Sequence, residues 1–93
     1  MASKSIMQDE KVCFLTNSTQ NLHRHHIFGG ANRDNSEKYG LWIYLTADMH
    51  NMSNKGIHFN RELAITIKQL GQKEFEKTHT REEFMRIFGK NYL

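Results

Sequence analysis

The segment from residue 41 to residue 46, Leu-Trp-Ile-Tyr-Leu-Thr, constrains the fold of this chain more than any other stretch. Its side chains are aromatic or aliphatic up to the final threonine, which is the composition of a β-strand. Residues 22–28 are a second strand candidate, and residues 11–15 are a further short one. Residues 29–40 between the two stronger candidates are expected to form a polar loop. We therefore expect 22–28 and 41–46 to pair as a hairpin.

Helical signals follow the second strand. Thr46 is a suitable cap for a short helix over residues 47–54, which Gly56 would end. Asn60 is a suitable cap for a longer helix, because apolar and small residues recur after it at helical spacing. These residues are Leu63, Ala64, Ile67, Leu70, Gly71 and Phe75.

A last short helix is marked at both of its ends. Thr80 and Glu83 have the spacing of a capping box, and Gly89 can supply the left-handed residue that ends the helix. The sequence therefore predicts an α+β fold, with one β-hairpin, a short helix after it and two carboxy-terminal helices.

The length of 93 residues suits one domain with a small core. We assign residues 11–93 to that domain and expect residues 1–10, which carry no apolar run, to be a flexible arm. The net charge of +3 permits a polyanionic partner such as DNA. No apolar run is long enough to cross a membrane, and the single cysteine, Cys13, fits a reducing compartment. We therefore expect a cytoplasmic protein without a membrane partner.

The histidines are concentrated in one part of the chain. Five of the six lie between positions 23 and 58, namely His23, His25, His26, His50 and His58. Imidazole is the commonest metal ligand and the side chain best suited to move a proton near neutral pH. The clustering thus predicts a metal site with an adjacent base, and hence a metal-dependent enzyme.

Three stretches of the chain resemble a known family. They are Leu22–Arg33 (LHRHHIFGGANR), Leu45–Asn51 (LTADMHN) and His58–Asn60 (HFN). With paired histidines before a glycine turn, a second strand and a histidine in the next helix, the chain resembles the HNH endonucleases and their ββα-metal motif. It is most similar to the small HNH proteins of bacteriophages and prophages, and the likeness extends through Phe88–Asn91. The resemblance implies an enzyme that cleaves DNA in the cytoplasm of a bacterial host cell.

The resemblance also implies a role for each of four histidines. His25, His50 and His58 would bind one divalent metal ion, and His26 would be the general base that deprotonates the attacking water. Some phage-type members carry His-Glu at this place, which would make His25 the base instead. Successive side chains on a regular strand point to opposite faces, so both histidines reach one site only if the strand ends or bulges beside the glycine turn.

The chain departs from the family at the structural zinc. Many HNH proteins hold that zinc with two Cys-x-x-Cys pairs. The four corresponding positions here are Cys13, Thr16, Thr46 and Met49. No structural zinc is therefore expected, and Cys13 should be a small buried apolar residue.

A second departure is the middle Asn of the motif, which usually stands just before the second strand. This chain has Tyr39-Gly40 at that point. Asn32 or Asn35 could structure the loop instead, or could simply form turns.

Two functions from different classes follow from these residues. Imidazole ligands favour Zn²⁺, Ni²⁺ or Mn²⁺ over Mg²⁺, and DNA phosphates could be bound by Arg24, Arg33, Lys38 and Lys55. The lost thiolates and the lost Asn also fit a catalytically degenerate HNH-like phage protein that binds nucleic acid or another protein, for example as an inhibitor of a host nuclease. Retention of four site histidines argues for the enzyme.

Overall fold

The computed structural model describes residues 4–52 and 60–93 of the chain. Within these residues the protein is a mixed α+β fold built on a two-stranded antiparallel hairpin of β1 (Leu22–His26) and β2 (Trp42–Thr46). The helices are η1 (Gly30–Asn32), α1 (Arg33–Lys38), η2 (Asp48–Met52), α2 (Arg61–Phe75) and α3 (Arg81–Phe88). The predicted α+β class, with its hairpin and its two carboxy-terminal helices, is confirmed.

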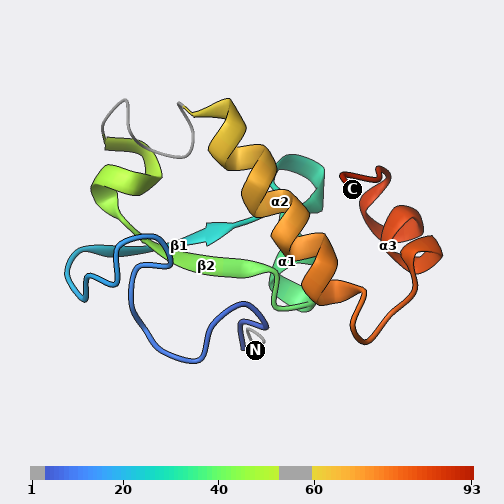
Figure 1. The fold of residues 1–93 in the computed structure, drawn as a ribbon, viewed down its shortest axis with the longest axis horizontal. Helices are drawn as coiled ribbons and strands as arrows, with labels where there is room; N and C mark the ends of the chain where they lie inside the picture. The colour runs from blue at the N-terminus through green and yellow to red at the C-terminus, as the bar shows by residue number, and fades with distance from the viewer. Residues whose placement is uncertain (1–3, 53–59) are drawn as a thin grey trace.

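The core lies where the hairpin meets α2 and α3. Figure 1 shows α2 crossing the hairpin, with α3 and the C-terminus beyond it. Gly71 lets α2 approach the chain just after β1, because a Cβ there would lie 3.3–3.4 Å from Ile27 and Phe28. The apolar core comprises Cys13, Ile27, Phe28, Leu41, Ile43, Leu45, Ile67, Phe75, Phe84 and Phe88.

The helix caps agree with their sequence signals. The Asn60 side chain accepts a hydrogen bond from the Leu63 N–H at 3.0 Å, and Thr80 with Glu83 forms the predicted capping box. Gly89 ends α3 with a φ of 81°. The helix expected over residues 47–54 is described as η2, a π-helical turn, while residues 53–54, Gly56 and the end of that segment lie outside the described residues.

Two predictions about local structure are wrong. Residues 11–15 form bends and a turn rather than a strand, although Cys13 is fully buried and the Phe14 N–H donates to the Tyr44 carbonyl at 2.8 Å. The segment 29–40 contains η1 and α1 instead of being a loop throughout. Ser36 anchors α1, since its hydroxyl accepts from the Phe28 N–H at 3.0 Å and donates to the Phe28 carbonyl at 2.7 Å.

The segment predicted as a flexible arm runs beside β2 from Ser5 onward. The Ser5 hydroxyl donates to the Trp42 carbonyl at 2.6 Å, and the Ile6 N–H donates to the Gly40 carbonyl at 2.9 Å. The Gln8 side chain then accepts from a backbone N–H of β2 at 2.8 Å. Part of residues 1–10 is thus bonded to the hairpin.

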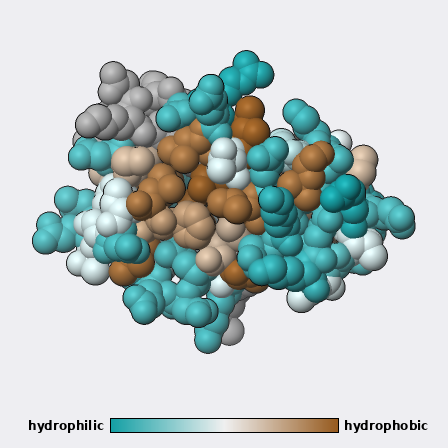
Figure 2. Space-filling model, viewed as in Figure 1, coloured by the Kyte–Doolittle hydropathy of each residue, from teal (hydrophilic) through white to brown (hydrophobic). Residues whose placement is uncertain are grey.

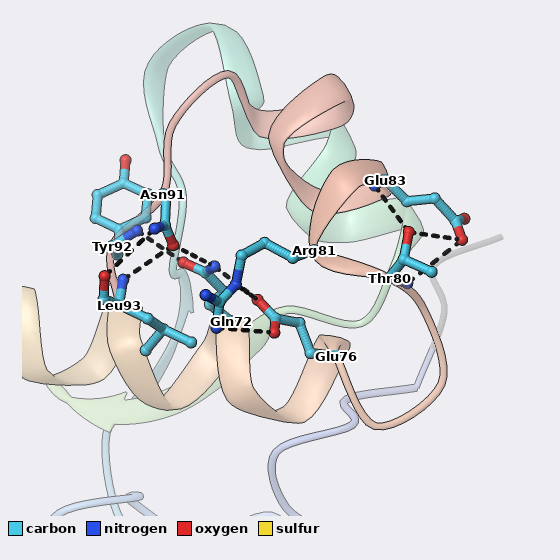
Figure 3. Close-up of polar contacts among 8 residues, drawn as sticks. All are labelled: Gln72, Glu76, Thr80, Arg81, Glu83, Asn91, Tyr92 and Leu93. Atoms are coloured by element: carbon cyan, nitrogen blue, oxygen red, sulfur yellow. Dashed lines mark hydrogen bonds and ion pairs between the residues drawn. The ribbon is translucent and has the colours of Figure 1, made fainter.

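A buried glutamine joins the C-terminal residues to α2 (Figure 3). Gln72 is fully buried, and its amide donates to Glu76 at 2.7 Å and to Asn91 at 2.8 Å while accepting from the Tyr92 N–H at 2.8 Å. Arg81 at the start of α3 pairs with the same Glu76. These bonds fix the chain end against the helix that covers the core.

Among the described helices, none has both the length and the apolar character that crossing a membrane requires.

Candidate functional site

The register of the hairpin divides the candidate residues between its two faces. β1 is paired continuously with β2, and His25 lies opposite Ile43 while His26 lies opposite Trp42. Opposite partners in an antiparallel pair share a face, and neighbours along a strand alternate. We call the face of His23, His25, Ile43 and Leu45 the core face, and the face of Arg24, His26, Trp42 and Tyr44 the outer face. Of the two alternatives expected beside the glycine turn, an end or a bulge of the strand, the structure shows the first, since the pairing is regular through both histidines and β1 ends at His26.

On the core face three imidazoles lie together, and we call His23, His25 and His50 the core-face histidines. His50 belongs to η2, which directly follows β2 and so returns toward the start of β1. Its ring centroid lies 5.3 Å from that of His25 and 5.4 Å from that of His23, both edge to face. The His23 and His50 Nδ1 atoms are 3.2 Å apart. The sequence paired His50 with His25, and the structure adds His23.

This spacing is suitable for a metal ion. Two nitrogens bound at normal length to one tetrahedral zinc are separated by roughly 3.4 Å, close to the Nδ1 separation of His23 and His50. The described residues hold no complete group of three or more metal-ligating side chains arranged for an ion. His58, the third predicted ligand, lies outside the described residues. The core-face histidines thus provide part of a possible coordination sphere.

On the outer face His26 is held by a carboxylate. Its Nε2 lies 2.8 Å from Glu37 Oε1, and Glu37 is carried by α1. Arg24 Nη1 lies 3.0 Å from both oxygens of the same carboxylate. The hydrogen bond from His26, opposed by burial and reinforced by Arg24, lowers the pKa of the Glu37 carboxyl below its usual value. Glu37 therefore stays ionised between two donors.

Aromatic side chains support the same cluster. The Arg24 guanidinium lies over the Trp42 ring at 3.8 Å from its centroid, and Trp42 contacts Tyr44 edge to face. A groove of about 550 Å³ opens beside them, and its other wall is made by Lys4, Ser5 and residues 8–11. Lys4 and Lys11 line this groove together with Arg24. The groove brings three basic side chains within reach of an anionic ligand, alongside the acidic Asp9 and Glu10.

The two asparagines expected to structure the loop join it to α3. Asn32 Nδ2 donates to the Phe88 carbonyl at 3.0 Å, and Asn35 Nδ2 donates to the Ile87 carbonyl and to Asn32 Oδ1, both at 3.3 Å. These bonds cross more than 50 positions of sequence and satisfy carbonyls at the C-terminal end of α3. They hold α1, and with it Glu37, in a fixed place.

The candidate phosphate contacts differ in their surroundings. Arg24 is engaged by Glu37 and Trp42, whereas Arg33 is exposed on α1. Lys38 is also exposed and lies 5.4 Å from the Tyr39 ring centroid. Lys55 lies outside the described residues.

The sequence does not assign a role to two residues of the candidate site, Glu37 and His23. Glu37 stands in a polar stretch without apolar periodicity, for which the sequence predicts a loop, whereas the structure has α1 there. His23 belongs to the histidine cluster but has no role in the resemblance, although its spacing of two from His25 places both on one face of a strand. That alternation was the available signal for His23. No comparable local signal indicates Glu37.

The chemistry available here combines a pair or trio of imidazoles on one face with an imidazole and carboxylate pair on the other. The first set can share a metal ion, and the second can hold a proton acceptor in a fixed orientation. Comparison of the chain with protein-family models, with curated proteins and with solved structures found no match.

Proposed function

We propose that this protein is a metal-dependent endonuclease of the HNH type that hydrolyses DNA phosphodiester bonds. The observation that carries the proposal is the contact between the His25 and His50 rings, 5.3 Å between centroids, on a hairpin followed by a helical turn. The sequence motif named these two residues as ligands of one ion. Their closeness, across 25 positions of sequence, is what a shared ion requires.

The open edge of β1 is where we propose that the two faces act on one substrate. Among the described residues the sheet has two strands, so β1 pairs with β2 along one edge only. A DNA strand lying along the other edge would meet the core-face histidines from one side and His26 from the other. Adjacent histidines on opposite faces are then compatible with one reaction, provided that the phosphate lies at the strand edge.

The donor set fits a transition metal, for which His25 and His50 are the proposed described ligands and His58 the proposed third. Such an ion, Zn²⁺, Ni²⁺, Mn²⁺ or Mg²⁺, supplies charge stabilisation at the scissile phosphate. The protein supplies the proton acceptor: neutral His26 takes the proton of the attacking water through the ring nitrogen that Glu37 does not occupy. A positioned base of this kind contributes roughly 10²- to 10⁴-fold to the rate.

DNA is the proposed substrate because the chain carries a net charge of +3 and basic residues flank the histidines. Arg33, exposed at the start of α1, and Lys55 are the proposed phosphate contacts on the approach to β1. Arg24 is the proposed phosphate contact on the hairpin itself, where it also forms an ion pair with Glu37. We place the reaction in the cytoplasm of a bacterial host, as for the phage proteins that the chain resembles.

The test is plasmid cleavage with each of the four metals and a chelator control, combined with calorimetric measurement of metal affinity. His50→Ala and His25→Ala should weaken metal binding strongly and abolish cleavage. His26→Ala should retain metal and DNA binding and lose cleavage. His79→Phe is the matched control, because His79 stacks on Phe75 with ring centroids 4.2 Å apart and should be dispensable for metal binding.

Three results would contradict the proposal. They are a wild-type protein that cuts neither supercoiled nor single-stranded DNA with any of the metals, metal affinity that survives His50→Ala unchanged, and full cleavage by His26→Ala. If the phenotypes of the His25 and His26 variants exchange, His25 is the base and His26 the ligand.

One observation favours the second candidate function, a binding module without catalysis. Ile65 and Leu70 on α2 are 40% and 39% exposed. Figure 2 shows hydrophobic residues gathered in the middle of the face that α2 crosses in Figure 1. Apolar surface of this kind can bind a protein partner. Ile65→Lys with Leu70→Lys would abolish such binding while leaving a nuclease active, so the pair of variants separates the two functions.

A further inference from the structure

The carboxylate of Glu37 lies against His26, a histidine of the proposed site. Its Oε1 lies 2.8 Å from His26 Nε2, a distance typical of a charge-assisted hydrogen bond. The His26 side chain is only 11% exposed, so its ring is held largely within the protein, while Glu37 is 30% exposed. We propose that Glu37 is a positioning residue that fixes the orientation and tautomer of the His26 ring. The inference rests on the proposed function, in which His26 is the base.

The ring nitrogens make the tautomer definite. An ionised carboxylate only accepts hydrogen bonds, so His26 Nε2 must carry the proton that it shares with Glu37. In the neutral ring Nδ1 is then unprotonated and can take a proton from water. Glu37 thereby leaves one defined nitrogen of His26 for the reaction.

Arg24 keeps the carboxylate in this role. Its Nη1 lies 3.0 Å from both Glu37 oxygens, and its guanidinium rests on the Trp42 ring. The Arg24 charge keeps Glu37 ionised and unable to donate to the histidine. A neutral amide at position 37 would behave differently, because its oxygen would turn to Arg24 and its NH₂ group would face His26.

The support beneath Glu37 is rigid. The preceding residue, Ser36, is fully buried and exchanges two hydrogen bonds with the Phe28 backbone, two positions beyond His26. Asn32 and Asn35 bind the same short helix to α3. A contact that served only to attach α1 to the hairpin would be redundant with these bonds.

The experiment compares wild-type protein with Glu37→Gln, Glu37→Asp and Glu37→Ala in metal-dependent cleavage of a fluorescent duplex, measured as kcat and KM separately. Glu37→Gln should lower kcat about 10- to 100-fold, the usual effect of losing an orienting partner, with KM and metal affinity unchanged. Glu37→Asp keeps the charge and should recover part of the loss. Glu76→Gln is the matched control, since Glu76 also accepts from an arginine but lies in the C-terminal network.

A spectroscopic measurement separates positioning from simple attachment. Long-range ¹H–¹⁵N correlation spectra of the imidazoles, recorded at about pH 8 where an ordinary histidine is neutral, report the tautomer of His26. Wild type should be protonated at Nε2, and Glu37→Gln should shift the proton toward Nδ1. If the contact were purely structural, its loss in Glu37→Gln would lower the free energy of unfolding without changing the His26 tautomer or kcat at low temperature.

The outcomes distinguish the two proposals. Active wild-type protein with unchanged kcat in Glu37→Gln overturns the role of Glu37 and leaves the nuclease intact. An active wild type whose kcat falls in proportion to folded fraction in all three variants also overturns it. Wild-type protein that is inactive with every metal overturns the proposed function, and this inference with it.

Discussion

At the scale of single residues, Glu37 is where the polar contacts of the outer face converge. It accepts from His26 and from Arg24, and its side chain is still 30% exposed. Solvent at that exposure weakens the ion pair, so most of its value lies in orientation rather than in stability. The residue is therefore more informative about chemistry than about folding.

The lowered pKa of Glu37 predicts a pH dependence of stability. A carboxyl whose pKa is lower in the folded than in the unfolded state stabilises the protein above the unfolded value, about 4.3 for Glu. That contribution is lost as the pH falls through the lower, folded value. The free energy of unfolding of wild type should thus decline more steeply than that of Glu37→Gln as the pH falls from about 5 to 3.

Urea unfolding at several pH values measures this difference. The two proteins should converge at the acid end, because protonated Glu37 no longer accepts as an anion. Parallel pH profiles, with a constant gap between wild type and variant, would show that the ion pair with Arg24 and His26 does not contribute in solution.

At the scale of elements, the predictable parts are those whose signals are local. β2, the cap at Asn60 and the capping box of α3 were all found from the sequence, because each depends on residues within one turn or one strand. α1 was missed, since its sequence is Arg-Asp-Asn-Ser-Glu-Lys and has no apolar stripe. It is held by Ser36 and by bonds to α3 that join distant parts of the chain. Long-range hydrogen bonds leave no periodic pattern to recognise.

The candidate site divides in the same way. Histidine clustering identified His25 and His50, which the structure brings together. The clustering could not show which face of the hairpin carries His25 and which carries His26. That assignment depends on the register of β1 against β2, which a single bulged residue would change. The contact of Glu37 with His26 depends on the position of α1, so it could not be predicted from the sequence.

Gly40 controls the attachment of the N-terminal segment to β2. Its φ is +72°, and a Cβ there would collide with the Lys4 carbonyl and lie 3.1 Å from the Ile6 side chain. Gly40→Ala should therefore lower the free energy of unfolding by about 1–3 kcal/mol. It should also expose residues 4–8 to protease.

Thermal unfolding and limited proteolysis test this, with Gly29→Ala as the matched control. Gly29 has a φ of −92° and no atom within 4 Å of a built Cβ, so that substitution should change stability little. Equal melting temperatures for the two variants would mean that the segment is not docked as described.

The cap of α3 gives a second prediction for elements. Thr80 accepts from the Glu83 N–H at 3.1 Å, so Thr80→Ala should cost about 1 kcal/mol of stability. For a domain of this size that is roughly 4–8 °C in Tm. Thr66→Ala, on the exposed middle of α2, is the control and should not lower Tm. A Tm for Thr80→Ala equal to that of the control would contradict the capping role.

At the scale of the whole molecule, the fold is held by apolar packing and by the hydrogen bonds of the buried Gln72 side chain. Ten buried apolar side chains form one core. They come from β2, from the residues directly after β1 and directly before β2, from α2 and α3, and from Cys13. Every buried side-chain nitrogen or oxygen among the described residues has a hydrogen-bond partner. Apolar packing thus connects the elements that a structural zinc holds together in many HNH proteins.

We therefore expect the protein to fold without a structural zinc. Purified protein treated with a strong chelator should keep its circular dichroism spectrum, and Tm should fall only by what the proposed active-site ion contributes through binding. His50→Ala, which lacks that contribution, should show no chelator effect at all. Loss of secondary structure on chelation, with one tightly held zinc per chain, would reveal a clamp built from other residues.

Because His25 and His26 are consecutive, a shift of β1 by one position against β2 would exchange the faces that carry them. If β1 lost one residue before His25, His26 would move to the core face and still meet His50. If β1 gained one residue there, His25 would move to the outer face and still meet Glu37. Ile27 and Phe28, buried in the core directly after β1, oppose either shift, because moving them by one position would turn their side chains away from the core.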